Sequence, residues 1–182
     1  VVRAGRGLVE ARRPTPVVVG EIGESARQEE LITLAEQLGL PVTAAGRLSF
    51  CNFPVGHPHD LGMFSMSSDY VSKGPDLIVF VGARDMGGKG LPDTAELPPG
   101  ARIIRIGIDT ASKGRNYPSD LALVGEVKEA LKDLTSVLDR SINKDRVKSG
   151  SQTRSAYSRS ATTAMRTRIA NGVKAKRGKR PR

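Results

Sequence analysis

The sequence contains a single cysteine, Cys51, and no tryptophan. One cysteine excludes an intrachain disulfide and a zinc site built on cysteine pairs, so the chain bears no mark of an oxidising compartment. No apolar run approaches the ~20 residues of a membrane-spanning helix, and the N-terminal residues do not form a signal-peptide core. These scarcities favour a cytoplasmic protein with no membrane partner.

Acidic residues are almost missing from the last quarter of the chain. Residues 141–182 hold 13 Lys and Arg against Asp145 alone, whereas residues 1–140 hold 16 Lys and Arg against 18 Asp and Glu. The formal net charge of +10 therefore belongs to a basic tail, and the remainder is nearly neutral. The 182 residues suffice for one domain with appendages.

Short apolar runs separated by helical patterns predict an open, mainly parallel sheet. The predicted strands are residues 16–19, 42–44, 76–82, 101–109 and 121–124. Ser25 and Gln28 form a capping box, from which a helix runs until Gly39 ends it, and another helix is predicted over 126–138. The connections suit crossovers better than hairpins, so we expect a doubly wound, Rossmann-like α/β fold of five or six strands.

Other parts of the predicted domain are less regular. Residues 45–66, which are rich in Gly, Pro, Asn and His, are expected to be irregular, with a short helix around residues 69–73. The predicted core contains Val18, Leu34, Leu38, Ile78, Val79, Ile104 and Leu131.

Six segments occur in a distinctive order: "ARRPTPVVVGEIGES", "LAEQLGLPV", "FPVGHPHDLGMF", "PDLIVFVGAR", "RIIRIGID" and "VGEVKEAL". Through them, residues 8–140 resemble the central domain of thiamine-diphosphate-dependent enzymes of the acetolactate synthase, benzoylformate decarboxylase and oxalyl-CoA decarboxylase group. The resemblance implies a parent subunit of three domains. One flanking domain would bind the pyrimidine end of thiamine diphosphate, and the other would bind its diphosphate through magnesium.

The resemblance covers only the middle one of these domains. The sequence has no Gly-Asp-Gly segment followed by the usual Asn, and no upstream domain that could supply the catalytic glutamate. We therefore expect no catalysis by this chain alone, and its partners would be the remaining domains or subunits of the enzyme. The expected division is a linker-helix remnant (1–14), the central domain (15–140) and a basic linker or tail (141–182). The absence of an initial Met suggests a piece of something longer.

A glycine turn, formed by Gly20, Ile22 and Gly23, separates the first predicted strand from the first helix. Free amides and the helix dipole favour an anion there, which would suit a pyrophosphate. Glu21 and Glu24 flank the turn, however, and their carboxylates would satisfy the dipole and repel a phosphate. Since the dinucleotide fingerprint also needs a third glycine, a tight structural turn is the favoured interpretation.

Two residues after later strands extend this candidate site. The resemblance implies that Arg84 reaches a pyrophosphate, although it could equally pair with Asp85 at the surface. Asp109 could hold a ribose hydroxyl, whereas Gly107 stands where flavin-binding relatives often carry an acidic residue, which favours ADP over FAD. We expect any nucleotide to lie across the carboxyl ends of the strands, touching Gly20, Ile22, Gly23, the loop residues Leu61, Gly62 and Met63, Arg84 and Asp109.

The segment "GHPHD" contains three residues that could act as metal ligands, His57, His59 and Asp60. Metal sites need three or four converging ligands, and the sequence offers no other histidine. A role in structuring the loop is therefore favoured. Cys51 has no neighbouring cue for activation and is expected to be a small, partly buried residue.

The basic tail allows three interpretations. It could be a severed linker, disordered or helical, with an apolar stripe of Tyr157, Ala161, Met165, Ile169 and Val173. It could be an arm that binds nucleic acid without sequence preference, or the product of a truncated or altered reading frame. The linker ranks first because the tail has almost no aromatic residues to stack on bases, and we expect it to be mobile. An independent flavin- or adenine-nucleotide-binding module is the alternative for the whole chain.

Overall fold

A six-stranded parallel sheet forms the centre of the computed structural model, which describes residues 1–19, 28–45, 52–65, 68–82, 97–109, 118–141 and 144–177. The strands are β1 (Pro14–Val18), β2 (Val42–Ala44), β3 (Asp60–Met63), β4 (Leu77–Val81), β5 (Arg102–Gly107) and β6 (Leu121–Val124). They lie in the order β3-β2-β1-β4-β5-β6, and every neighbouring pair is parallel. The predicted α/β class and parallel sheet are confirmed.

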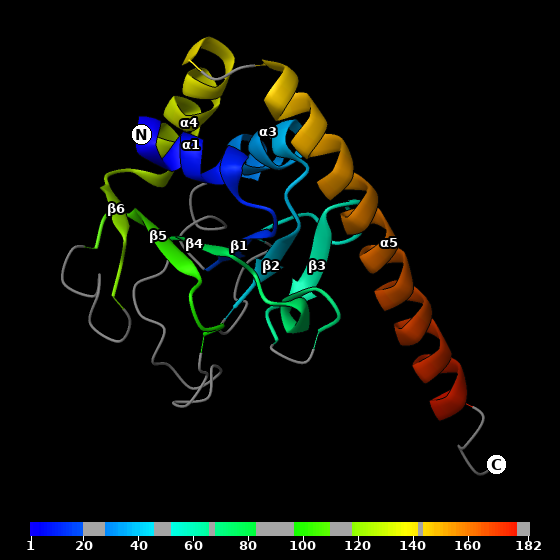
Figure 1. Cartoon of the computed structure of the whole chain (residues 1–182). Helices are drawn as coiled ribbons and strands as arrows, with labels where there is room; N and C mark the ends of the chain where they lie inside the picture. Colours follow the sequence, from blue (N-terminus) through cyan, green and yellow to red (C-terminus); the bar gives the residue numbers. More distant parts are fainter. Residues whose placement is uncertain are drawn as a thin grey trace.

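Three helices cover one face of this sheet (Figure 1). They are α1 (Val2–Glu10), α3 (Gln28–Leu38) and α4 (Val127–Ser141), and their apolar stripes meet the inward side chains of the strands. The predicted core is confirmed, because each of its seven residues is at most 4% exposed. Burial on both faces explains why β4 is continuously apolar and why β1, apart from Thr15, is apolar rather than alternating.

The helix α3 ends where Gly39 allows a left-handed backbone conformation. Gly39 adopts a φ of 65°, which only glycine takes without strain, and its amide donates to Glu36 O at 3.4 Å. The amide of Leu40 donates to Ala35 O at 2.8 Å, which completes a Schellman motif. The predicted stop at Gly39 is therefore confirmed, whereas Ser25 of the predicted capping box lies outside the described residues.

The strand β3 corrects one expectation, because it lies within the stretch that was expected to be irregular. Leu61, Gly62 and Met63 belong to an edge strand and not to a loop. Hydrogen bonds from Val42 N to His59 O and from Phe64 N to Ala44 O hold β3 against β2. Gly62 has a positive φ (70°), and the pairing of β3 with β2 shifts its register nearby. This irregular pairing differs from that of a regular strand, which is why the sequence of β3 did not predict one.

A smaller core lies on the second face of the sheet. Phe80 and Ile78 of β4 pack there with Val71 of the 3₁₀ helix η1 (Val71–Lys73) and with Tyr70, the residue before it. The hydroxyl of Tyr70 donates to Pro14 O at 3.1 Å, and burial raises the pKa of this phenol. This bond joins η1 to the start of β1.

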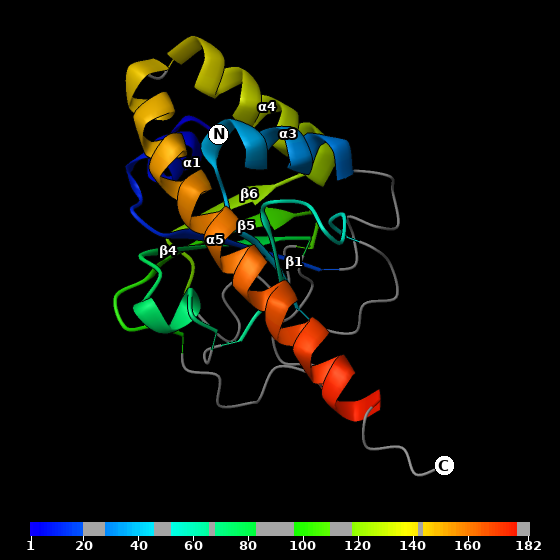
Figure 2. The same cartoon turned by 90° about the vertical axis from the view of Figure 1, so that its right-hand side faces the viewer.

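The basic tail forms the long helix α5 (Lys144–Arg177), which runs along the β3 side of the molecule and continues past the sheet (Figures 1 and 2). This corresponds to the helical alternative, but its buried stripe differs from the expected one. The buried side chains are Val147, Arg154, Ser158 and Thr162. Tyr157 and Ala161 are half-buried, and Tyr157 packs on Tyr70 and donates to Asp69 O. The side chains of Met165, Ile169 and Val173 lie outside the description.

The expected mobility of the tail stays a prediction. In the structure, the first half of α5 packs on the domain mostly through small and polar side chains, and Val147 and Tyr157 add apolar contacts. Despite its length, α5 is far from apolar, and no helix in the described part of the chain could span a membrane.

Candidate functional site

The carboxyl ends of β1, β4 and β5 lie next to one another at a single edge of the sheet, the carboxyl edge. Backbone hydrogen bonds continue past the strands, from Val19 N to Val81 O (3.2 Å) and from Gly82 N to Ile106 O (2.9 Å). Gly82, the residue after β4, has a φ of 70°, which glycine adopts more readily than other residues. Open parallel sheets bind ligands at such an edge.

Half of the predicted site residues cannot be placed at this edge. Gly20, Ile22, Gly23 and Arg84 lie outside the described residues, as does Cys51. The four predicted site residues belong to segments 20–27 and 83–96, which come shortly after β1 and β4 in sequence, whereas Cys51 belongs to segment 46–51. Their role in nucleotide binding stays a prediction.

The three predicted residues of β3 have different surroundings. Leu61 packs against the smaller core, and the amide of Gly62 donates to Asp60 Oδ1 at 2.9 Å. The side chain of Met63 is 48% exposed at the end of the strand. Only Met63 thus presents a free surface to a ligand, because Leu61 and the Gly62 amide are engaged within the domain.

Asp109 lies two residues beyond β5 and is half-buried. Four strand spacings of about 4.8 Å separate β3 from β5, so Met63 and Asp109 are roughly 19 Å apart across the sheet. The structure therefore does not bring these two predicted contacts together. A ligand that touched both would have to be extended, passing over the ends of β2, β1 and β4.

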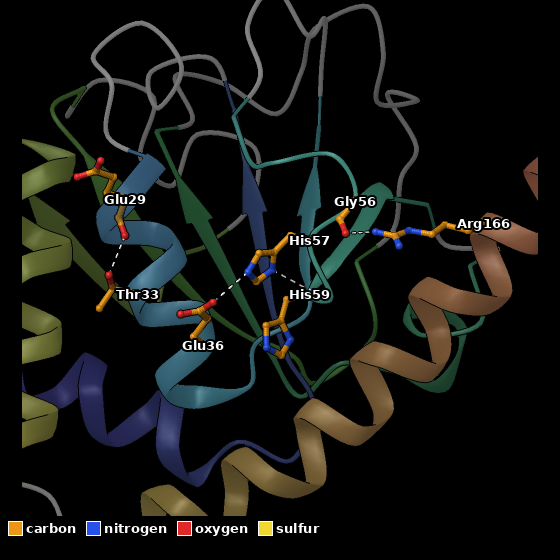
Figure 3. Close-up of polar contacts among 7 residues, drawn as sticks. All are labelled: Glu29, Thr33, Glu36, Gly56, His57, His59 and Arg166. Atoms are coloured by element: carbon orange, nitrogen blue, oxygen red, sulfur yellow. Dashed lines mark hydrogen bonds and ion pairs between the residues drawn. The ribbon is translucent and has the colours of Figure 1, made fainter.

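The two histidines hold the loop before β3 in place (Figure 3). The amide of His59 donates to His57 Nδ1 at 3.2 Å. His57 Nε2 lies 3.2 Å from Glu36 Oε1 of α3, and the edge of Phe53 packs on the same imidazole ring. Asp60 Oδ2 accepts from Gly56 N at 3.3 Å. These contacts are those that the loop-structuring interpretation requires.

His59 is only 6% exposed. Burial lowers its pKa, the charges of His57 and Arg159 lower it further, and Glu36 opposes them. Within the described ranges, no group of three His, Cys, Asp or Glu side chains is arranged to hold a metal ion.

An open groove of about 420 Å³ lies between α3 and α4. Its lining residues are Glu29, Glu30, Thr33, Lys132, Thr135 and Ser136. The hydroxyls of Thr33 and Thr135 donate to carbonyl groups of their own helices, and Glu30 lies 3.5 Å from Lys128. The groove is therefore a polar seam between two helices, with its threonine hydroxyls already engaged.

Two charged residues that the sequence analysis did not single out join the elements behind the carboxyl edge. Asp76 accepts the amides of Arg12 and Arg13 at 2.7 and 2.8 Å and so fixes the link between α1 and β1. Arg154 of α5 donates to Ala11 O and Leu38 O, at the ends of α1 and α3. The aspartate before "LIVFVG" offered a sequence signal, whereas Arg154 stands among small polar residues and offered none.

Comparison with known proteins covers most of the domain. The family model for the central domain of thiamine pyrophosphate enzymes matches residues 2–134. The acetolactate synthase of Mycobacterium leprae is 32% identical over 140 residues, which are 74% of this chain and 22% of that enzyme. The large subunit of acetolactate synthase isozyme 3 from Escherichia coli is 28% identical over 142 residues, covering 76% and 24%.

Solved structures show the same architecture. The thiamine diphosphate-dependent 4-hydroxybenzoylformate decarboxylase of Rhodococcus jostii RHA1 superposes with a TM-score of 0.62 and 31% identity, over 76% of this chain and 27% of that one. The benzoylformate decarboxylase of Polynucleobacter necessarius, at 22% identity and a TM-score of 0.59, supports the fold alone, over 74% and 26%. The chain spans about a quarter of the length of these relatives. It belongs to the family of thiamine pyrophosphate enzyme central domains.

Proposed function

We propose that this chain acts as the central domain of a thiamine-diphosphate-dependent enzyme of the acetolactate synthase type and binds an adenine nucleotide at its carboxyl edge. The similarity to acetolactate synthases over 140 residues supports the enzyme class. Because the chain spans only about a quarter of such an enzyme, formation or cleavage of a carbon–carbon bond next to a carbonyl would belong to the assembled enzyme. The partners would be its remaining domains or subunits.

Thiamine diphosphate and magnesium do not fit the residues of this chain. The sequence has no Gly-Asp-Gly segment that could bind a metal and a diphosphate. In the part that the structure describes, the acidic and histidine side chains do not form a metal-binding group. Binding of this cofactor, and the catalysis that depends on it, would belong to the partner domains.

The observation that supports nucleotide binding is the carboxyl edge, where β1, β4 and β5 end side by side. An adenine nucleotide would extend along it, with Met63 at one side and Asp109 at the other. Arg84 follows Gly82 by two residues and would supply the positive charge for the phosphates. Gly107 stands where an acidic residue is common in flavin-binding relatives, which favours ADP over FAD.

Calorimetric titration of the full chain with ADP and with FAD tests this proposal. We expect heat of binding with ADP, and an affinity at least about tenfold weaker in Arg84→Ala, since a charge-assisted hydrogen bond contributes about 1.5 kcal/mol or more. Arg140→Ala, in the last turn of α4, is the matched control and should bind like the native chain. The site is wrong if Arg84→Ala binds normally, and the nucleotide proposal is wrong if neither ligand gives heat at millimolar concentration.

Two competing functions have distinct signatures. A yellow purified chain would favour an independent flavin-binding module. Retention on nucleic acid that is lost when residues 141–182 are deleted would favour the arm interpretation of the basic tail.

A further inference from the structure

The proximal part of α5 is anchored by a buried arginine. Arg154, 6% exposed, donates from Nε to Leu38 O at 2.8 Å and from Nη1 to Ala11 O at 3.1 Å. Both acceptors are carbonyl groups at helix ends, where the helix dipole favours a cation. The helix also passes very close to Gly39, since a Cβ atom there would lie 2.6 Å from Ser155 Oγ. This anchor ties α5 to α1 and α3.

The distal part of α5 rests on the loop before β3. The hydroxyl of Thr162 lies 3.0 Å from Pro58 O and 2.9 Å from Asp60 O, one on each side of His59. One turn further on, Arg166 donates to Gly56 O (Figure 3). The acceptors are backbone carbonyl groups and the donors are polar side chains, so water can replace either partner when the helix lifts.

Two buried polar atoms at this distal contact have no partner in the described structure. They are His59 Nδ1 and Ser158 Oγ. Each unsatisfied buried group costs about 1–3 kcal/mol relative to its hydrated state. The distal contact therefore carries two such costs, whereas the Arg154 anchor carries one, at Nη2.

A proton on His59 would meet mostly unfavourable charges. His57 of the same loop and Arg159 of α5 disfavour the charged imidazole, and burial disfavours it more strongly than either. Glu36 of α3 is the opposing charge, but its carboxylate already lies against His57 Nε2. Lifting the distal helix would return His59 to water and carry Arg159 away.

We propose that the distal part of α5, from Ser158 onward, is a pH-sensitive strap that lies on the loop while His59 is neutral and leaves it when His59 takes up a proton. Release uncovers the carbonyl groups of Pro58 and Asp60, and with them the outer edge of β3. Such an unpaired edge can accept another strand.

The direction of the pH dependence follows from the sign of the shift. The docked state lowers the pKa of His59 below its ordinary value of about 6.5. Docking is therefore strongest above about pH 6.5 and is lost as the pH falls through the lowered value. At pH 5.5, one unit below the ordinary value, a single proton shifts the ratio of docked to released helix by up to about tenfold.

Distances between pairs of spin labels in the full chain, in a Cys51→Ser background, test the strap. One pair joins Val55→Cys on the loop to Ala170→Cys on distal α5, and the control pair joins Val55→Cys to Gln152→Cys on proximal α5. All three labelled positions are exposed. When the pH is lowered from 7.5 to 5.5, we expect a population with a longer label-to-label distance to appear for the distal pair, while the distance of the control pair stays unchanged. No change in the distal pair, or an equal change in both pairs, overturns the proposal.

Two variants assign the effect to His59. His59→Gln removes the titrating group, so the distal distance should no longer depend on pH. If that variant folds poorly, Arg159→Ala provides the test, because it removes one positive charge near His59 and should weaken the dependence of the distal distance on pH. Lys148→Ala removes an equal charge from the exposed face of α5 and should behave like the native chain. An unaltered pH response in Arg159→Ala, or in a folded His59→Gln variant, contradicts the proposal.

Discussion

Replacing Arg154 by alanine tests the largest single polar contribution that the structure shows between α5 and the domain. The guanidinium is buried and stays charged, although burial lowers its pKa. Its two hydrogen bonds bridge the ends of α1 and α3, which are far apart in the sequence but adjacent in the fold. Alanine would leave the carbonyl groups of Ala11 and Leu38 without this donor.

The magnitude follows from the two bonds and from their burial. Each hydrogen bond from a charged donor contributes about 1.5–3 kcal/mol. The desolvation of the guanidinium, whose Nη2 atom has no partner, offsets part of this sum. We expect Arg154→Ala to lower the free energy of unfolding by about 2–4 kcal/mol, a large share of the 5–15 kcal/mol typical of a domain. Arg154→Lys should lose about half as much, because an ammonium group lacks the fork that reaches both carbonyls.

Urea unfolding followed by helical circular dichroism measures this effect. With a slope of about 2 kcal/mol per molar urea, Arg154→Ala should lower the midpoint by roughly 1–2 M. Lys148→Ala, on the exposed face of the same helix, should shift it by less than about 0.3 M. If Arg154→Ala shifts the midpoint no more than this control, the two carbonyl contacts do not stabilise the fold and the anchor is wrongly assigned.

Two further predictions concern packing and activity. Gly39→Ala should lower the urea midpoint more than Gly74→Ala, because both glycines have a φ near 70° but only a Cβ at Gly39 would collide with α5; equal shifts would mean that α5 does not pack there. The purified chain, mixed with thiamine diphosphate, magnesium and pyruvate, benzoylformate or oxalyl-CoA, should show no turnover above a heat-treated control. Cofactor-dependent turnover would contradict the assignment of catalysis to partner domains.

The central strands could be predicted because the apolar pattern that identifies them depends only on the residues of each strand. A strand buried on both faces is expected to be apolar at nearly every position; β4 meets this condition fully, and β5 meets it apart from Arg102 and Arg105. Leu34, Leu38 and Leu131 followed from helical periodicity, which also depends on neighbouring residues alone.

Elements that depend on distant partners could not be predicted in the same way. The sequence of β3, "DLGM", has no β-branched residue, and its strand exists because β2 offers a free edge and α5 supports its carbonyl groups. The apolar stripe that was expected in α5 is confirmed at Tyr157, which packs on Tyr70, but the most deeply buried contacts come from Arg154, Ser158 and Thr162. Periodicity identifies apolar stripes, but a helix that binds backbone carbonyl groups needs donors instead.

The central position of β1 has a consequence for synthesis of the chain. One edge of β1 pairs with β2, which follows shortly after it, while the other edge pairs with β4, which emerges from the ribosome much later. Until Leu77–Val81 has been made, the backbone groups along one edge of Pro14–Val18 would have no partner strand in the nascent sheet. Pro14 and Pro16 do not blunt this edge, because they face β2 as Val18 does, whose carbonyl accepts Ala45 N, whereas Val19 N donates to Val81 O on the β4 side. The waiting edge therefore keeps its amides and can pair with other nascent chains during this interval.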